Sequence, residues 1–453
     1  MTTADDLARR TREHFPAIRS DLEDLVRIPS VSSPAFDQAQ VAASADAVAA
    51  LLRDAGMPQV EVLTAETADG ATSRPAVVAH RPGPVGALTV LLYAHHDVQP
   101  PGADESWDTD PFEPTRRGER LYGRGAADDK AGIMAHVGAL RVLGESLGVG
   151  VTVFAEGEEE IGSPTFTDFL RTHADRLRAD VIVVADSGNW KVGVPALTTS
   201  LRGLVDCEVE VRVLEHAVHS GMFGGPVLDA VTLMARLVAT LHDQNGDVAV
   251  AGLTGSDEAA VDYPEEDLRA DASVVDGYRL AGTGPLAARL WRKPAISVVG
   301  LDATTVAAAS NTIAPVCRAK LSVRIAPGQD PADAERLLVD HLLAHAPFGA
   351  QVRVTPGERG HAFDAAGDTE HMRTARWAFS QAWGREPVDI GVGGSIPFIS
   401  ELKQVFPGAE ILVTGVEDPD SRAHSENESV HLGELEKVVL AEALLLARLG
   451  GQV

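Results

Sequence analysis

The sequence has few cysteines, few lysines and no long apolar segment. Cys207 and Cys317 are the only two cysteines among 453 residues, which excludes a disulfide framework and a cysteine-based zinc site. We expect both to be buried thiols, for which a reducing cytoplasm is the simplest setting. No apolar run approaches the ~18 residues that span a membrane, and residues 1–15 are too charged for a signal peptide.

Positive charge is also scarce. Lys and Arg total 39 against 66 Asp and Glu, so the formal net charge is −27. An acidic surface repels the phosphates of nucleic acids and anionic lipids, so we expect neither nucleic acid nor a membrane as a partner. The same negative charge favours the binding of divalent cations. The apolar fraction of 45% is that of a globular protein, and the length allows two or three domains.

Short apolar runs alternate with amphipathic segments along much of the chain. This pattern predicts an α/β fold with a mostly parallel sheet flanked by helices. The runs predicted as buried strands are residues 87–94, 150–155, 180–185 and 410–414. The segments predicted as helices are residues 4–27, 40–55, 130–147, 164–177 and 431–449.

The middle of the chain has a different pattern. Apolar and polar residues alternate over 205–213 and 317–325, which predicts strands with one buried face in an antiparallel sheet. Helices predicted over 226–242 and 331–345 would cover that face. We therefore expect a small α+β domain at 198–358, inserted into a catalytic domain formed by residues 1–197 and 359–453.

Residues that bind metals or transfer protons follow all four predicted buried strands. His95, His96 and Asp97 follow the first, EGEEE at 156–160 the second, Asp186 the third, and His424 comes shortly after the fourth. A single residue of this kind is most often a turn or surface residue. The carboxyl ends of parallel strands meet at one edge of a sheet, however, so we expect these side chains to converge there.

The spacing around the first strand suggests how one histidine is held. On an extended strand end His95 and Asp97 point the same way, whereas His96 points to the opposite face. Asp97 is therefore expected to hydrogen-bond the His95 ring and fix its tautomer. In GRGAADDKAG at 123–132, two glycines permit a tight turn before a helix, where Asp128 is either a helix cap or a bridging carboxylate.

Taken together, these motifs resemble a known family. HHDV at 95–98, GRGAADDKAG at 123–132, EGEEEIGS at 156–163, Asp186 and AHSENE at 423–428 resemble the di-zinc exopeptidases, which include carnosinases, cytosolic nonspecific dipeptidases, aminoacylases and succinyl-diaminopimelate desuccinylases. The dipeptidase branch is the most similar. The motifs that favour it are DVQPPG at 97–102, HSGMFGG at 219–225 and GGSIP at 393–397.

The resemblance implies two divalent metal ions as cofactors. His95, Asp128 and Asp186 would bind one ion, and Asp128, Glu160 and His424 the other, so that Asp128 bridges the pair. Mixed histidine and carboxylate ligands with an open position suit catalytic Zn²⁺, and Mn²⁺ or Co²⁺ would also fit.

The resemblance also implies the catalytic groups. Asp97 would support His95, and Glu159 would be the general base for a water activated by the two metals. His219, in the inserted domain, would be an oxyanion donor. The residues around His219 by themselves favour a simple turn position beside Gly221.

Further roles fall on substrate recognition and assembly. Arg324 would bind the substrate carboxylate through its bidentate guanidinium, with Asn311, Gly394 and Ser395 as further binding residues. The inserted domain would act as a lid and mediate homodimerisation. The expected substrate is a small peptide with a free C-terminus.

Two readings of the activity remain open at this level. The first is a metal-dependent dipeptidase, and the alternative is an N-acyl-amino-acid amidohydrolase of the aminoacylase or desuccinylase type, because both cleave an amide beside a free carboxylate. An intact Glu159 argues against a non-catalytic relative. A serine hydrolase is not favoured, since Gly394-Ser395 lacks the G-x-S-x-G elbow, and the glycines at 123–125 lack the third glycine of a dinucleotide site.

Overall fold

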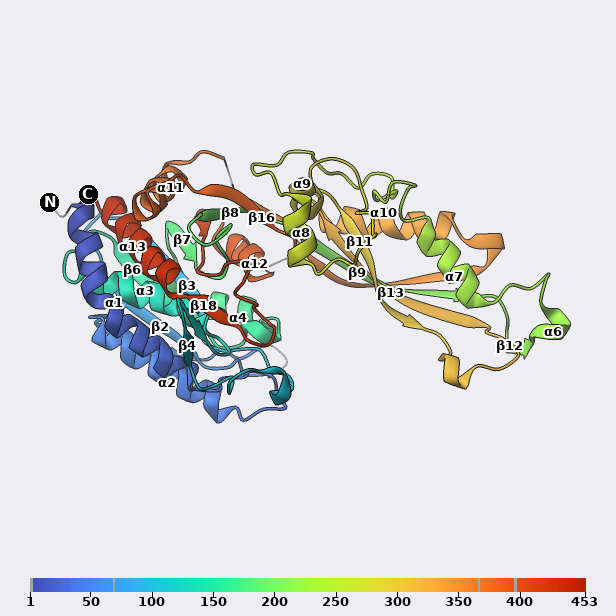
Figure 1. Cartoon of the computed structure of the whole chain (residues 1–453), viewed down its shortest axis with the longest axis horizontal. Coiled ribbons are helices and arrows are strands. Elements are labelled where there is room, and N and C mark those ends of the chain that lie inside the picture. Colours follow the sequence, from blue (N-terminus) through green and yellow to red (C-terminus); the bar gives the residue numbers. More distant parts are fainter. Residues whose placement is uncertain (1–2, 68–69, 366, 395–396) are drawn as a thin grey trace. The chain divides into compact units, whose positions relative to one another are not determined.

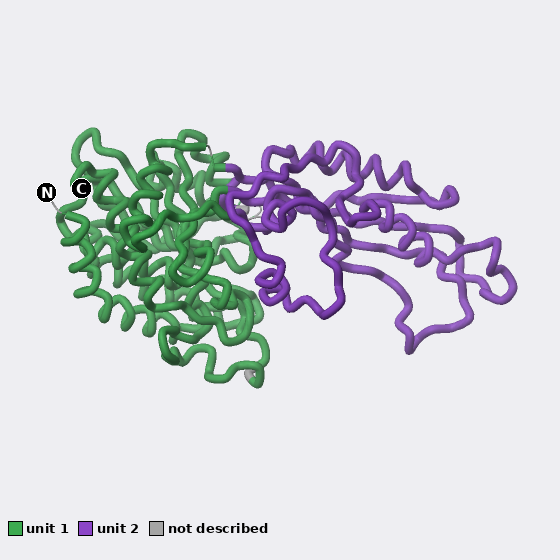
Figure 2. The backbone as a smooth tube through the Cα atoms, turned by 45° about the horizontal axis from the view of Figure 1, so that its top comes forward, with its two compact units in different colours: residues 1–199, 365–390, 401–453 green, residues 200–364, 391–400 purple. Residues whose placement is uncertain are grey.

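The computed structural model describes residues 3–67, 70–365, 367–394 and 397–453 (Figure 1). The chain divides into two compact units, shown in different colours in Figure 2. One unit comprises Met1–Thr199, Ala365–Ile390 and Glu401–Val453, and the other comprises Ser200–Asp364 and Gly391–Ser400. The catalytic and lid roles expected for the two parts of the chain stay predictions.

A large sheet has most of its residues in the first unit. Its strands are β1 (Gln59–Leu63), β2 (Ala76–Arg81), β3 (Thr89–His95), β6 (Gly150–Glu156), β7 (Val181–Val184), β8 (Ala196–Leu201), β15 (Phe363–Asp364), β16 (Val388–Val392) and β17 (Glu410–Val413). The order is β1-β2-β6-β3-β7-β17-β8-β15, with β16 also paired with β8. β6, β3, β7 and β17 run parallel to one another, whereas β1, β2 and β8 are antiparallel to their neighbours. The central strands read as continuous apolar runs because both of their faces are buried.

Helices pack against this sheet. They are α1 (Ala4–Val26), α2 (Ala39–Asp54), α3 (Lys130–Leu143), α4 (Phe166–Thr172), α5 (Ala174–Leu177), α11 (Glu370–Trp383), α12 (Pro397–Val405) and α13 (Leu432–Leu449). α1 begins at a capping box, in which Thr3 and Asp6 satisfy each other's backbone N–H groups. α1, α3 and α13 lie side by side (Figure 1) and share one hydrophobic core with the sheet.

The second unit contains an antiparallel sheet of order β11-β13-β9-β14. These strands are β9 (Gly203–Arg212), β11 (Ala295–Asp302), β13 (Val316–Ile325) and β14 (Gln351–Gly360). α7 (Ala230–Ala239) and α10 (Pro331–Ala344) cover one face, where Cys207 and Cys317 are buried as free thiols. Two further helices, α8 (Glu265–Asp271) and α9 (Leu286–Trp291), lie in the long excursion between α7 and β11.

Smaller elements complete the chain. A three-stranded sheet combines β4 (Thr115–Arg117), β5 (Arg120–Tyr122) and β18 (Ser429–His431). β10 (Val218–His219) and β12 (Thr312–Ile313) form a two-stranded sheet beside α6 (Ser220–Phe223). The 3₁₀ helices are η1 (Asp104–Ser106), η2 (Glu159–Ile161), η3 (Val306–Ala308) and η4 (Pro347–Gly349).

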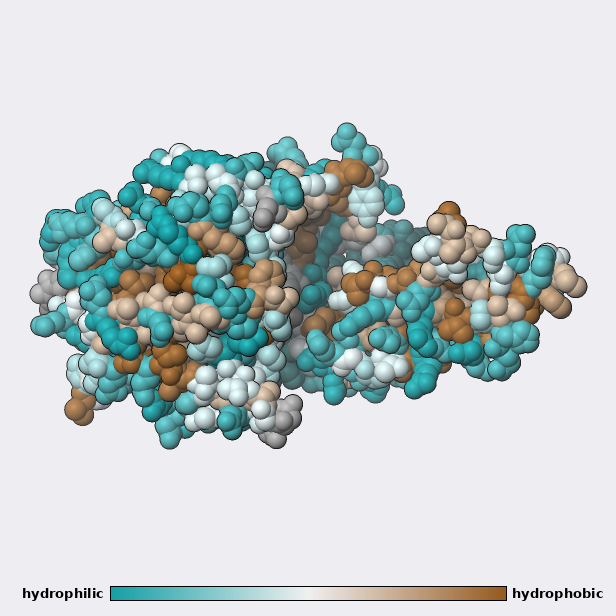
Figure 3. Space-filling model, turned by 90° about the horizontal axis from the view of Figure 1, so that it is seen from below, coloured by the Kyte–Doolittle hydropathy of each residue, from teal (hydrophilic) through white to brown (hydrophobic). Residues whose placement is uncertain are grey.

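This architecture confirms the predicted fold class. Each predicted buried strand is present within two residues of its expected bounds, and the alternating segments of the insert form the antiparallel β9 and β13. The surface viewed in Figure 3 is largely hydrophilic with scattered hydrophobic side chains, in keeping with the acidic composition. Across the described part of the chain, no helix is both long enough and apolar enough to cross a membrane.

One carboxyl group lies inside the hydrophobic layers of the first unit. Glu156, at the end of β6, is only 3% exposed, and the Tyr93 hydroxyl of β3 donates to its Oε2 at 2.6 Å. Phe154 and Phe166 pack edge-on against the Tyr93 ring. Burial raises the pKa of Glu156 to about 8, although the hydrogen bonds from Tyr93 and Ser163 oppose this shift.

Glu156 should make stability depend on pH. A carboxyl group whose pKa rises on folding stabilises the fold below its unfolded pKa, and this contribution is lost as pH rises through the folded pKa. We therefore expect wild type to lose on the order of 2–4 kcal/mol between pH 5 and 9 relative to Glu156→Gln, which cannot ionise. Urea unfolding at several pH values measures this difference. Glu105→Gln, at an exposed position, should follow wild type, and a pH-independent difference for Glu156→Gln would contradict the assignment.

Candidate metal centre

Three potential metal ligands meet where the parallel strands of the first unit end. His95 ends β3, Asp128 precedes α3, and Glu160 lies in η2 after β6. One ligand atom from each lies within 4.8 Å of the others. His95 Nε2 is 3.0 Å from Asp128 Oδ1. His95 and Asp128 are buried and Glu160 is half-buried, so most of the cluster is shielded from solvent.

A second histidine completes the arrangement around Asp128. His424 Nε2 lies 3.0 Å from Asp128 Oδ2 and 3.2 Å from Glu160 Oε2. The two oxygens of Asp128 therefore face two different histidines, as a bridging carboxylate requires. His424 has a φ of +61°, a conformation that residues with side chains adopt rarely, so its loop holds it there against a local preference.

The histidines carry the compensating charge of this cluster. Burial opposes the charged form of His95, but hydrogen bonds with Asp128 and Asp97 outweigh it and raise the His95 pKa well above its ordinary value. Hydrogen bonds with Asp128 and Glu160 raise the pKa of His424 to about 11. Burial would raise the pKa of Asp128, but hydrogen bonds from His424 and His95 hold it well below its usual range. Cation binding at these ring nitrogens requires their deprotonation, so it would release protons.

The other carboxylates of this edge disfavour one another's charge. Burial, together with the charge of Asp128, raises the pKa of Glu160 to about 7. Burial and Asp128 likewise raise the pKa of Asp186, which follows β7, to about 6 against the opposing effect of His95. The pKa of Glu159 is raised well above its usual value by burial and by Asp186 and Glu160, again against His95. Such a concentration of buried negative charge, with imidazole nitrogens beside it, fits divalent cations.

Asp97 ties the first histidine to the glutamate turn. Its Oδ1 and Oδ2 accept from the backbone N–H groups of Glu159 and Glu160 at 3.2 and 3.0 Å. The His95 ring contacts Asp97, but more closely through the backbone than through the predicted carboxylate: Nδ1 lies 3.1 Å from the Asp97 carbonyl oxygen and 3.5 Å from Oδ1. This leaves Nε2 facing Asp128. His96 points elsewhere, as expected, and its Nε2 lies 2.9 Å from the carbonyl oxygen of Pro75.

Three residues that hold the metal ligands in place lie in the sequence motifs described above, but no role was predicted for them from the sequence. Gln99 donates to both carboxylate oxygens of Glu160 through its backbone N–H and its side-chain amide. Asp129 accepts from the His95 backbone N–H at 3.2 Å, and a Cβ on Gly132 would lie 2.1 Å from its Oδ1, so glycine is needed there. The third is Glu428, the last residue of AHSENE.

Glu428 organises the loop that carries Asp128. Its side chain is fully buried and forms a 2.7 Å ion pair with Arg124, which is only 2% exposed. The two carboxylate oxygens also accept from the backbone N–H groups of Gly125, Ala127 and Asp128 at 2.9–3.1 Å. Glu428 thereby fixes the backbone on which Asp128 stands.

Removing the Glu428 charge should loosen this loop. We expect Glu428→Gln to lower metal affinity about 10- to 100-fold, as loss of groups that orient metal ligands commonly does. Calorimetric titration of the metal-stripped protein with Zn²⁺ measures the change. Glu426→Gln, at an exposed position in the same motif, is the matched control and should bind as wild type does. Equal affinities for the two variants would contradict this role of Glu428.

Two predicted site residues meet in the second unit. His219 is exposed, pairs with Thr312 across β10 and β12, and accepts from the Gly221 backbone N–H through Nδ1 at 3.0 Å, capping α6. The carbonyl oxygen of Asn311 accepts from the Ser220 backbone N–H at 2.9 Å. His219 and Asn311 thus share one small substructure.

The predicted carboxylate-binding residues also lie in the second unit. Arg324 is half-buried on β13, and Gly394 is half-buried after β16. Ser395 lies outside the described residues.

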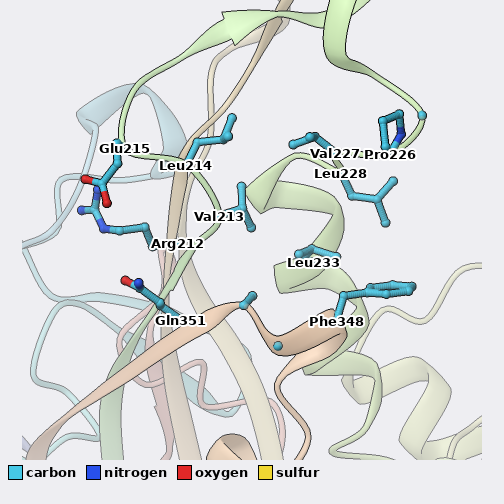
Figure 4. Close-up of a pocket in the computed structure, with 13 residues that line it drawn as sticks. Arg212, Val213, Leu214, Glu215, Pro226, Val227, Leu228, Leu233, Phe348 and Gln351 are labelled. Carbon is cyan, nitrogen blue, oxygen red and sulfur yellow. The ribbon is translucent and has the colours of Figure 1, made fainter.

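A separate cavity of about 660 Å³ opens in the second unit (Figure 4). Its walls are mainly aliphatic, with Arg212 and Glu215 together at one side, Phe348 at the other and Val227 and Leu228 above. None of the predicted site residues lines it.

A histidine and carboxylate cluster at the carboxyl ends of parallel strands, beside the half-buried Glu159, fits a metal-dependent hydrolase. The family model described as Peptidase family M20/M25/M40 matches residues 91–448, and the chain belongs to this family. This confirms the family resemblance of the motifs and makes the protein a hydrolase of the metallopeptidase class.

Individual relatives agree with this assignment. The chain is 36% identical to a cysteinylglycine-S-conjugate dipeptidase of Corynebacterium striatum, over 81% of this chain and 82% of the relative. It is 28% identical to a Cys-Gly metallodipeptidase of Schizosaccharomyces pombe, over 76% of each chain. The crystal structure of human carnosine dipeptidase 1 shares the fold, with a TM-score of 0.78, 24% identity and 99% of both chains covered.

Proposed function

We propose that the protein is a metal-dependent dipeptidase that hydrolyses dipeptides with a free C-terminal carboxylate. The observation that carries this proposal is the Asp128 carboxylate, whose two oxygens face His95 and His424 beside Glu159 and Glu160. The similarity to dipeptidases of Corynebacterium and fission yeast supports the dipeptide as substrate. The N-acyl-amino-acid amidohydrolase alternative has less support.

The proposed cofactors are two divalent ions, with Zn²⁺ first and Mn²⁺ or Co²⁺ as alternatives. His95, Asp128 and Asp186 would hold one, and Asp128, Glu160 and His424 the other. When bound, such a pair supplies a water of lowered pKa and polarises a carbonyl group. The mixture of imidazole and carboxylate donors supports Zn²⁺ over Mg²⁺ or Ca²⁺, which prefer oxygen ligands alone.

Glu159 is the proposed general base. Its backbone is held by Asp97, and its side chain stands among Asp186, Glu160 and His95, which all influence its charge. A raised pKa suits a group that takes a proton from the attacking water and returns it to the leaving amine. Asp97 keeps both Glu159 and His95 in place during this transfer.

The second unit is proposed to supply substrate recognition. Arg324 would bind the C-terminal carboxylate, with Asn311, the Gly394 backbone and the Ser395 hydroxyl as additional donors. His219 would donate to the developing oxyanion. His219 is proposed to act in the active site of a partner subunit.

A mixed substrate pool tests the proposed function. The pool contains unmodified dipeptides, β-alanyl dipeptides, and N-acetyl and N-succinyl amino acids, incubated with enzyme and Zn²⁺ or Mn²⁺ and followed by mass spectrometry. We expect the unmodified dipeptides to disappear and a chelator to prevent their loss. Loss of only the acylated amino acids would support the amidohydrolase alternative, and loss of nothing would contradict both.

Replacing the proposed base separates catalysis from metal binding. Glu159→Gln should lower kcat on dipeptides at least about 10³-fold, because an amide cannot accept the proton. The metal content, measured by mass spectrometry of the native protein, should stay at two ions. Near-normal turnover by a variant that binds both metals would remove Glu159 from this role.

We further propose a homodimer formed through the edge strand β11. Val298, Val299 and Leu301 of β11 are 44%, 59% and 53% exposed, an unusual run of apolar side chains for a free edge. Both edge strands have a register shift, β11 between Val298 and Gly300 and β14 beside Pro356, but β14 also contains a proline, which disfavours pairing there. Edge-to-edge association through β11 would cover the apolar run.

A charge on this edge should separate the subunits. We expect wild type to sediment at twice 47.7 kDa and Val299→Glu to shift towards the monomer, because a carboxylate at the centre of the pairing edge would be desolvated. Val275→Glu, at a 72% exposed position in the excursion, is the control and should leave assembly unchanged. Analytical ultracentrifugation measures both, and a wild-type monomer would contradict the proposal.

A cytoplasmic location is proposed from the two thiols. Cys207 and Cys317 are free and buried, and burial raises the pKa of both, which keeps them unreactive. Free thiols of this kind are at home in a reducing compartment.

A further inference from the structure

Two arginine side chains share one face of the antiparallel sheet in the second unit. Arg324 of β13 stands directly opposite Leu204 of β9, and Arg202 precedes Leu204 by two residues. Residues two apart on an extended segment point to the same face. Arg202 and Arg324 are therefore diagonal neighbours, at a separation that long side chains bridge.

Arg202 is a buried cation with backbone partners. It is 8% exposed, its Nε donates to the Gly393 carbonyl oxygen at 2.9 Å, and its Nη1 donates to that of Lys293 at 3.4 Å. Within the described residues, no carboxylate forms an ion pair with Arg202. Burial and the charge of Arg324 lower the pKa of Arg202 to about 10. Two neighbouring guanidiniums, one buried without a counter-ion of its own, call for an anion.

The same side chain holds the glycine loop after β16. The backbone N–H of Arg202 donates to the Val392 carbonyl oxygen at 3.3 Å, and its side chain holds the next residue, Gly393. A Cβ on Gly393 would lie 2.9 Å from Arg202 Nη2, so the glycine lets the guanidinium lie against the loop. Gly394, the next residue, was predicted to contact the substrate carboxylate.

We propose that Arg202 is a positioning residue of the carboxylate subsite: it fixes the loop at 392–394 and adds a second positive charge beside Arg324. The site thereby selects substrates with a free terminal carboxylate over neutral ones. This inference rests on the proposed dipeptidase function for its substrate, but the anion preference itself is measurable without turnover. Arg202 acts through the loop and through its field, whereas Arg324 is the contact residue.

Two substitutions separate charge from hydrogen bonding. Arg202→Gln keeps an N–H donor for the Gly393 carbonyl and removes the charge, whereas Arg202→Lys keeps the charge. The substrates are S-methylcysteinylglycine and its C-terminal amide. For Arg202→Gln we expect KM for the acid to rise about 10-fold, KM for the amide to change little and kcat to stay within about 2-fold. Arg202→Lys should retain most of the preference for the acid.

A matched control is available in the same unit. Arg292 is partly exposed and pairs with Asp364 at 3.1 Å, so Arg292→Gln removes an arginine charge that already has a carboxylate partner. It should leave both KM values unchanged. An equal loss for the acid and the amide in both Arg202 variants would reduce Arg202 to a structural residue and overturn the proposal, as would an unchanged acid preference in Arg202→Gln.

Direct binding keeps this inference separate from the proposed function. Calorimetry compares the acid and the amide as ligands of the metal-loaded Glu159→Gln protein, or of wild type if neither compound is cleaved. The inference is supported if the acid binds more tightly than the amide and if this difference disappears when Arg202→Gln is introduced into the same protein. This holds even where dipeptide cleavage fails. Equal binding of the acid and the amide overturns it even where cleavage succeeds.

Discussion

Negative charge accumulates at the edge where the parallel strands of the first unit end, and the loops around this edge are arranged to stabilise it. Burial and neighbouring carboxylates raise the pKa values of Glu159, Glu160 and Asp186, whereas hydrogen bonds from His95 and His424 hold that of Asp128 low. Like charges at this separation in a low-dielectric site cost several kcal/mol unless cations or protons neutralise them. Hydrogen bonds from His95, His424 and Gln99 hold the carboxylates of Asp128 and Glu160, and the remaining negative charge fits the binding of divalent cations.

Those supporting bonds explain why the loops have so little freedom. Asp97 holds both the His95 ring and the turn of Glu159 and Glu160, while Glu428 joins the loop before α3 to the segment after His424. Apart from the local contact between His95 and Asp97, these hydrogen bonds join loops that are distant in the sequence, so the ligand geometry depends on the assembled sheet and not on any single loop. A rigid ligand set of this kind binds a metal without first paying to reorganise.

The fold class and a metal-dependent chemistry could be predicted from the sequence, because both depend on local patterns. Continuous apolar runs identify strands buried on two faces, and placement after those strands groups His95, Glu160, Asp186 and His424. The supporting roles of Gln99, Asp129 and Glu428 were missed because they depend on backbone N–H groups in distant loops. For the same reason, nothing in the local pattern shows that residues 391–400 cluster with the second unit or that Arg202 grips Gly393.

The charge at the metal edge, the sheet edge that carries the candidate metal ligands, also bears on the choice between a dipeptidase and an N-acyl-amino-acid amidohydrolase. Glu417 adds a further carboxylate there, and burial together with Asp128 and Asp186 raises its pKa well above the ordinary value. Two divalent ions carry +4 against −3 from the three ligand carboxylates, so the edge reaches a net charge of −1 only when Glu159 and Glu417 are both ionised. An N-succinyl group would bring another negative charge to this edge, whereas the protonated α-amino group of a dipeptide brings a positive one. Arg202 and Arg324 are proposed to bind the carboxylate that both substrate classes share, so the two classes differ in the charge that they bring to the metal edge, and an acidic edge favours the positive charge of the dipeptide.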